Sequence, residues 1–296
     1  MTAALRSDTM RALGTVSPAL AALHRALRAA GPMPALDPVT YAEAHAAFEA
    51  CSDQRALLTS WLRRRLGSLA ATAQPVSVLS VGCGDGAVDA PLADLLTRDP
   101  ERRVRYAGID PFPGSTTAWA ARMAGLGRPG LAAAAVTATF DGAVEEPAAY
   151  DVVMFVHSLY YVPDVGAALA RAARQLAPGG ELLVLHAPRT GLNELTGLLA
   201  PVVPGAPPQW WAETTVLAVA ASGLRAEPGT LSGRLNLGRC LDPEDEVGRA
   251  VLDFTVQARL TDALRPLVLD RLRELALPGP DLLVEHPLST WVLRAA

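Results

Sequence analysis

Hydrophobic positions follow two different periods along this chain. Over about the first 70 residues they recur every three or four positions, as in Leu20, Leu23 and Leu27, which predicts helices. A second helix is expected to start near Asp37-Pro38, after the break GPMPALDP, and a third covers about 52–66. From residue 76 the pattern changes to short apolar runs that alternate with helical stretches. The pattern therefore predicts a helical N-terminal segment followed by an α/β domain.

Five apolar runs are predicted to be strands of a parallel sheet. They are SVLSVG, RVRYAGID, LAAAAVTATF, YDVVMFV and ELLVLHAP. Three helices are expected between these strands: one that begins at Asp89, one over about 115–124 and one from Asp164 to Leu176. The segment Ala177-Pro178-Gly179-Gly180 is expected to end the third helix. Continuous apolar strands separated by helices indicate a sheet that is covered on both faces.

After residue 200 the pattern predicts two more strands and an insertion. A helix over about 211–222 leads to a sixth strand, GLRAEPGTLSG, and HPLSTWVLRA is expected to be the seventh. Two helices, near 243–258 and 261–276, lie between them, and an insertion of this length usually forms a lid or cap. The predicted fold class is α/β: a Rossmann-like, seven-stranded, mostly parallel sheet with helices on both faces, an N-terminal helical extension and a helical cap insertion. The predicted division is 1–70, then 71–233 with 285–296 as the core, and 234–284 as the cap.

Composition narrows the possible functions. The net charge of −4 argues against a protein that binds nucleic acid by neutralising phosphates. The sequence has no run of 18 apolar residues and no clean signal-peptide core, so no membrane span and a cytoplasmic location are expected. All 26 basic residues are arginine, which excludes a Schiff-base lysine and a P-loop lysine. Three distant cysteines, Cys51, Cys83 and Cys240, predict neither a disulfide framework nor a metal site.

The first predicted strand runs into a glycine-rich loop, VLSVGCGDG, with Gly82, Gly84 and Gly86. Glycines permit backbone angles and a close approach that a Cβ would block. A loop at the carboxyl end of a strand, followed by a helix N-terminus, is where open α/β sheets bind ligands. By itself the loop also matches the GxGxxA pattern of a dinucleotide-binding protein, and Ser80 stands where many such loops carry an acid.

Acidic residues after the next two strands bear on the ligand. Asp110 ends the second strand, where a carboxylate can accept hydrogen bonds from both ribose hydroxyls of a nicotinamide or an adenosyl cofactor. Asp141, in FDGA after the third strand, offers an acceptor for an adenine amino group. Together with the turn in QLAPGGELLVLHAP that leads directly into the fifth strand, this favours the adenosyl cofactor.

As an ordered set, VLSVGCGDG, GIDP, FDGA, YDVVMFVHSLYYV and LAPGGELLVL resemble the motifs of class I S-adenosylmethionine-dependent methyltransferases. The resemblance covers residues 76–187 and implies an enzyme that uses S-adenosyl-L-methionine to methylate a small molecule. It places the three loop glycines near the methionine end of the cofactor, Asp110 at the ribose, and Asp141 with Gly142 near the adenine.

A narrower set of runs resembles histamine N-methyltransferase and its bacterial relatives. The runs are VLSVG, HSLYYVPD, PLSTWV and the helix that carries Tyr41, and that family also lacks an acid in its first strand. The resemblance implies that Asp110 and Pro111 bind the ribose, that Ser115 lies near the cofactor and that Val156 flanks the adenosyl group. On the acceptor side the chain departs from the family. Gln54, His157 and His286 replace its glutamate, glutamine and asparagine, and Leu192 and Thr196 replace its tryptophans, which argues against histamine itself.

His157, which follows the fourth strand, is the candidate catalytic residue, as a polar contact or as a base for a hydroxyl acceptor. Tyr160 and Tyr161 are expected to line the acceptor pocket or to pack against the following helix. The predicted acceptor residues are Tyr41, Gln54, His157, Tyr160, Tyr161 and His286. The expected reaction is in-line methyl transfer to an amine or ring nitrogen of a small molecule. An O-methyltransferase with His157 as base, an NAD(P)-dependent oxidoreductase and a non-catalytic cofactor-binding protein are the alternatives, and the oligomeric state is not predicted.

Overall fold

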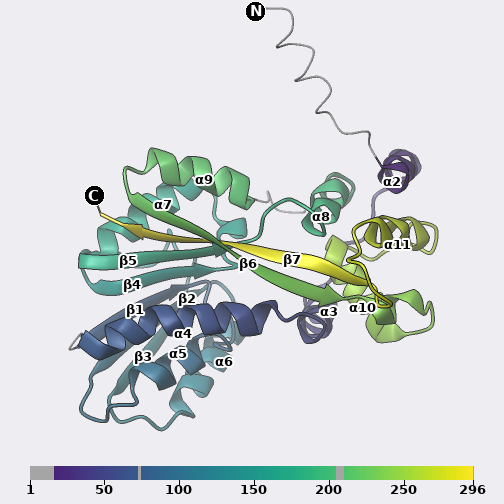
Figure 1. The fold of residues 1–296 in the computed structure, drawn as a ribbon. Coiled ribbons are helices and arrows are strands. Elements are labelled where there is room, and N and C mark those ends of the chain that lie inside the picture. Colours follow the sequence, from purple (N-terminus) through teal and green to yellow (C-terminus); the bar gives the residue numbers. More distant parts are fainter. Residues whose placement is uncertain (1–16, 73–74, 205–209, 296) are drawn as a thin grey trace, which may run out of the picture. The chain divides into compact units, whose positions relative to one another are not determined.

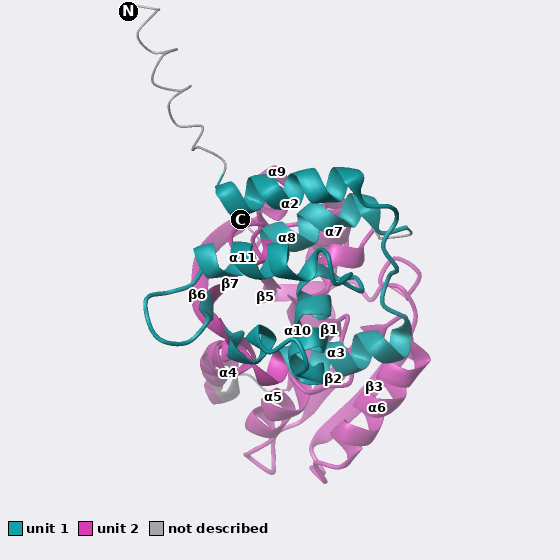
Figure 2. Cartoon of the chain, turned by 90° about the vertical axis from the view of Figure 1, so that its right-hand side faces the viewer, with its two compact units in different colours: residues 1–48, 194–206, 236–284 teal, residues 49–193, 207–235, 285–296 magenta. Residues whose placement is uncertain are grey.

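The structure is a computed structural model that describes residues 17–72, 75–204 and 210–295. The chain divides into two units, each made of several stretches of sequence (Figure 2). Unit 1 comprises residues 1–48, 194–206 and 236–284, and unit 2 comprises residues 49–193, 207–235 and 285–296. In the described ranges no helix is long and apolar enough to cross a membrane.

Unit 2 is built on a seven-stranded sheet in the order β3-β2-β1-β4-β5-β7-β6 (Figure 1). Strands β1 to β5 pair in parallel, and β7 runs antiparallel to β5. The strands are β1 Val76–Val81, β2 Val104–Asp110, β3 Leu131–Thr137, β4 Tyr150–Val156, β5 Leu176–His186, β6 Arg225–Asn236 and β7 Leu283–Arg294. This topology confirms the predicted Rossmann-like, mostly parallel sheet.

Helices cover both faces of this sheet (Figure 1). One face packs against α4 Gln54–Thr72, α5 Asp89–Leu96 and α6 Pro113–Ala124, and the other against α7 Val165–Gln175 and α9 Ala212–Ala221. Because successive side chains of a strand point to opposite faces, β1 gives Val78 to the first core and Leu79 to the second. Burial on both faces explains why the sequence shows continuous apolar strands without a polar alternation.

Strand β5 begins earlier than the sequence predicts. The segment Ala177-Pro178-Gly179-Gly180 is expected to be a turn before the strand, but it forms an irregularity inside β5, where the register with β4 shifts between Tyr150 and Val152. A Cβ on Gly180 would lie 2.9 Å from the carbonyl oxygen of Tyr150. The segment is therefore a bulge, in which glycine allows two backbones to come close.

The described part of unit 1 is mainly helical. Its helices are α2 Pro18–Ala29, α3 Pro38–Ala50, which ends in unit 2, α8 Asn193–Leu199, α10 Glu246–Val256 and α11 Arg265–Glu274, with short turns η2 Ala200–Val202 and η3 Gly238–Leu241. The insertion before β7 contains two helices, as expected, whereas α8 is not predicted. Within this unit, Arg271 connects α11 to α8 through an ion pair with Glu194 at 2.7 Å, and it also pairs with Glu274 of its own helix at 3.1 Å.

Candidate functional site

The loop between β1 and α5 is shaped by three glycines in the left-handed region. Gly82, Gly84 and Gly86 have φ angles of +70°, +54° and +81°. A Cβ on Gly82 would lie 2.3 Å from Cβ of Ser158, and one on Gly86 would lie 2.9 Å from Cδ1 of Trp119, whereas no atom lies within 4 Å of a Cβ on Gly84. Gly82 and Gly86 are thus required by packing within the protein. Gly84 alone of the three presents a bare backbone to open space.

Asp110, at the carboxyl end of β2, is hydrogen-bonded to this loop. Its Oδ2 accepts from the backbone N–H of Gly84 at 3.0 Å, and its Oδ1 accepts from the N–H of Phe112 at 3.0 Å. The side chain is buried, but each carboxylate oxygen can accept a further bond. The structure therefore brings together the glycine loop and the predicted ribose-binding acid. Pro111 is exposed just beyond, and Ser115 lies half-buried in the first turn of α6.

The other predicted cofactor residues lie at the ends of β3 and β4. Asp141 and Gly142 are exposed in a turn after β3, where the N–H groups of Gly142 and Ala143 donate to the carbonyl of Thr139. Val156 is half-buried at the end of β4. Because these strands are parallel, their carboxyl ends lie at one edge of the sheet, in the order β3-β2-β1-β4. All predicted cofactor residues therefore come from one edge.

His157, the first residue after β4, has an unusual backbone and a specific partner. Its φ is +53°, which is uncommon for a residue other than glycine and often marks a functional site. Its Nδ1 lies 3.0 Å from the hydroxyl of Tyr160, whose oxygen accepts from the N–H of Ala187 at 2.9 Å. The tyrosine proton is then best used as a donor to Nδ1. When Tyr160 donates in this way, the ring proton of His157 lies on Nε2.

The surroundings of His157 hold it neutral. Burial, together with the neighbouring His286 and His186, lowers its pKa to about 3. Burial also lowers the pKa of His186 and of His286 to about 4 each. Glu49 and Arg55, which form an ion pair, act on His157 in opposite directions. All three histidines are uncharged near neutral pH, so this part of unit 2 disfavours a positive charge.

Two of the predicted acceptor residues, Gln54 and His286, form hydrogen bonds between the start of α4 and β7. Gln54 is buried at the start of α4, and its Nε2 donates to the carbonyl oxygens of His286 and Pro287, at 2.9 and 3.4 Å. Nδ1 of His286 lies 2.8 Å from the hydroxyl of Ser52. These bonds connect the start of α4 to β7, an attachment that sequence reasoning misses because it joins residues more than 230 positions apart.

The three tyrosines of the prediction lie in different settings. Tyr160 stacks on the ring of His186, with centroids 4.2 Å apart, and is the tyrosine that contacts His157. Tyr161 is 60% exposed. Tyr41 belongs to unit 1, where its ring lies 5.4 Å from that of Phe254, so its role at the acceptor stays a prediction.

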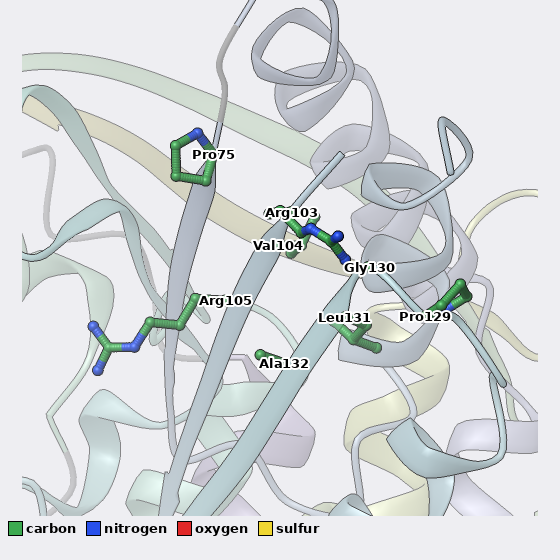
Figure 3. Close-up of a pocket in the computed structure, with 8 residues that line it drawn as sticks. All are labelled: Pro75, Arg103, Val104, Arg105, Pro129, Gly130, Leu131 and Ala132. Carbon is green, nitrogen blue, oxygen red and sulfur yellow. The ribbon is translucent and has the colours of Figure 1, made fainter. Parts of the chain in front are cut away.

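The structure also has a pocket outside the predicted site. Figure 3 shows a pocket lined by Pro75, Arg103, Val104, Arg105, Pro129, Gly130, Leu131 and Ala132. These residues lie at the amino ends of β1, β2 and β3, the edge opposite the glycine loop, so the pocket is separate from the predicted site.

In the described ranges no group of three or more histidine, cysteine and acidic residues is placed to hold a metal ion.

Comparisons with known proteins agree with this geometry. A family model described as a methyltransferase domain matches residues 44–209, which is more than half of the chain. Two solved structures share the fold, each at 12% sequence identity. The YcgJ protein of Bacillus subtilis has a TM-score of 0.55, and the match covers 79% of this chain and 98% of that one. A candidate methyltransferase of Bacillus halodurans has a TM-score of 0.53, and the match covers 78% of this chain and 96% of that one.

A candidate histamine N-methyltransferase of Thermotoga maritima is also similar, at 14% identity over 79% of this chain and 89% of that one. Its TM-score of 0.42 is too low to carry an argument about the acceptor. No curated protein matches the sequence. The family match covers the glycine loop, Asp110 and His157, and on this basis the chain belongs to the S-adenosylmethionine-dependent methyltransferases.

Proposed function

We propose that the enzyme transfers a methyl group from S-adenosylmethionine to a neutral nitrogen, an amine or ring nitrogen, of a small molecule. The observation that carries this proposal is the position of His157 beside the glycine loop, where its Nδ1 contacts Tyr160 and its pKa is lowered. Ser158, the next residue, packs directly on Gly82. His157 therefore stands next to the loop at which the cofactor is expected.

The glycine loop and its neighbours suit this cofactor. Gly84 allows a ligand to approach the backbone, and Asp110 keeps acceptor capacity for ribose hydroxyls. Asp141 is exposed at the same edge and can accept from the adenine amino group. When bound there, S-adenosylmethionine supplies the electrophilic methyl group, and the protein's part is to hold the acceptor in line and exclude water. Family membership sets aside the nicotinamide cofactor of an oxidoreductase.

A nitrogen acceptor agrees with the electrostatics around His157. A neutral amine or ring nitrogen already has the lone pair that the displacement needs, but a protonated one does not. The burial that lowers the pKa of three histidines in unit 2 also favours the neutral form of a bound amine. The Nε2–H of His157 is then a donor that can orient the acceptor molecule, rather than a group that removes a proton.

A hydroxyl acceptor with His157 as base is less well supported. A general base works best when its pKa lies near the operating pH, and that of His157 is lowered to about 3. Its Nδ1 is occupied by Tyr160, so only Nε2 faces away from that bond, and when Tyr160 is the donor to Nδ1, Nε2 carries the ring proton. An O-methyltransferase would have to place its base elsewhere.

The test pairs an acceptor survey with two substitutions. Radiolabelled S-adenosylmethionine is incubated with matched amines, imidazoles, phenols and carboxylic acids, and the methylated product is identified by mass spectrometry. For a nitrogen acceptor, we expect His157→Gln, which keeps an N–H donor, to retain most of the rate that His157→Ala loses. A general base would instead cost about 10²–10⁴-fold in both variants. Methylation of a phenol or carboxylate, with both variants equally inactive, would overturn the nitrogen assignment.

A further inference from the structure

A buried acidic residue lies beneath the glycine loop and has no part in the proposed reaction. Asp89, in the first turn of α5, is 1% exposed. The indole Nε1 of Trp119 donates to its Oδ2 at 2.6 Å, and the hydroxyl of Tyr106 donates to its Oδ1 at 3.1 Å. The hydroxyl of Ser80 in β1 donates to the same carboxylate. Three neutral donors from β1, β2 and α6 therefore converge on one carboxylate.

Trp119 connects this carboxylate to the loop. Its indole is fully buried between two glycines: a Cβ on Gly86 would lie 2.9 Å from Cδ1, and a Cβ on Gly108 would lie 3.0 Å from Cε2. The ring thus forms the surface on which the loop rests at Gly86. A shift of the ring would move it against the backbone of the loop, because no side chain lies between them.

The same helix, α6, also holds the loop from its exposed side. Arg122 donates from Nε to the carbonyl oxygen of Asp85 at 2.9 Å and from its terminal nitrogen to Oδ2 of Asp85 at 2.6 Å. Gly84, whose own N–H donates to Asp110, directly precedes Asp85, the residue that Arg122 holds. Its position therefore depends on how α6 and its Trp119 are seated.

Keeping this carboxylate buried has a cost. Burial raises the pKa of Asp89 to about 6, even though Trp119, Ser80 and Tyr106 donate to it. A buried acid that is held ionised by neutral donors is a poor choice for stability alone, because an apolar or amide side chain would avoid the desolvation. This cost points to a use in binding.

We propose that Asp89 is a positioning residue for the cofactor: by fixing the indole of Trp119 it holds Gly86, and with it Gly84, where the cofactor binds. Ser80 stands in β1 where many such loops carry an acid, and its side chain interacts with the carboxylate of Asp89 from α5. The inference rests on the proposed location of the cofactor at the glycine loop.

The test compares Asp89→Asn with Asp94→Asn, an equivalent change on the same helix. Asp94 is partly exposed and paired with Arg128, away from the loop. Binding of S-adenosylhomocysteine is measured by calorimetry at pH 8. We expect Asp89→Asn to weaken binding about tenfold, in keeping with the loss of a hydrogen bond to a charged group. Asp94→Asn should stay within roughly twofold of the wild type, as is usual for an exposed ion pair.

A stability measurement separates positioning from a structural role. An acid whose pKa is raised by folding costs stability once the pH has risen above that pKa, so the melting temperature of Asp89→Asn at pH 8 should equal or exceed that of the wild type. A residue that only stabilised the fold would lower the melting temperature and the affinity together. That joint loss would overturn the inference.

Two more variants complete the design. Trp119→Phe removes the N–H that donates to Asp89. If Asp89 acts through Trp119, the double variant Asp89→Asn with Trp119→Phe should bind S-adenosylhomocysteine no more weakly than the single variant with the lower affinity. Additive losses would contradict the route through Trp119. Asp110→Ala tests the cofactor site itself: unchanged binding in this variant would reject the site, whereas weak binding in Asp110→Ala with normal binding in Asp89→Asn would reject only the role of Asp89.

Discussion

Replacing Gly84 by alanine should separate cofactor binding from stability. The residue has φ +54°, and an added Cβ would meet no protein atom within 4 Å. The only cost within the protein is that of a left-handed backbone with a side chain, about 1–2 kcal/mol. For a domain of 150–250 residues, each 1 kcal/mol lowers the melting temperature by roughly 2–4 °C. The variant should therefore fold, and its melting temperature should fall by only several degrees.

Its effect on the cofactor should be larger, because the methyl group stands where the ligand approaches. Forcing a methyl group into a tightly packed contact costs about 1–3 kcal/mol, which corresponds to roughly 5- to 150-fold weaker binding. Gly82→Ala and Gly86→Ala cannot replace this experiment, since their Cβ atoms would collide with Ser158 and Trp119. Binding of S-adenosylhomocysteine is measured by calorimetry and unfolding by differential scanning fluorimetry.

Gly127→Ala is the matched control. Gly127 has φ +59°, its added Cβ also meets nothing within 4 Å, and it lies after α6, outside the predicted site. Both variants carry the same backbone cost, so only the proximity of the cofactor distinguishes them. Equal affinities in Gly84→Ala and Gly127→Ala, with equal melting temperatures, would show that no ligand approaches Gly84 and would refute the reasoning.

Two other predictions concern the same unit. Asp110→Ala should weaken cofactor binding by about 1–3 kcal/mol in calorimetry, as expected when a hydrogen bond to a charged group is lost, and unchanged affinity would exclude a ribose contact. Stability should fall as the pH drops from about 6.5 toward 4, because the unfolded chain takes up protons that His157, His186 and His286, with their lowered pKa values, do not bind in the folded state. Thermal unfolding measured across this range should show a shallower slope in His186→Gln, and an identical slope would contradict this account.

The sequence predicts those helices and strands that are determined by residues close together in the chain. Apolar runs bounded by Gly, Pro and Asp define β1 to β4 and α7, and Asp164 caps α7 as expected, accepting from the N–H of Ala167 at 2.9 Å. The pairing of Asp110 with the glycine loop also follows from the sequence, since the carboxyl ends of neighbouring parallel strands lie at one edge. Local pattern and sheet geometry suffice for these features.

Features that depend on distant packing are not predicted. Asp89 matches the start of a helix, where an acid is favourable, and nothing nearby in sequence shows that Tyr106 and Trp119 bury its carboxylate. Gln54 is predicted at the acceptor from a resemblance, but its amide bonds to the carbonyls of β7. The replacement of an acid by Ser80 in β1 is the one sequence signal that could have directed attention to a second acid nearby.

The strand order at one end of the sheet makes β6 dependent on β7. β7 pairs with β5 over Leu182–His186, and β6 has β7 as its neighbour in the sheet. A variant that detaches β7 therefore releases two strands at once and uncovers the edge of β5, whose sequence there is LLVLH. Such an apolar edge is a template for pairing with another chain. Mutations along β7 are thus expected to appear first as insoluble protein in the cell, before any catalytic defect can be measured.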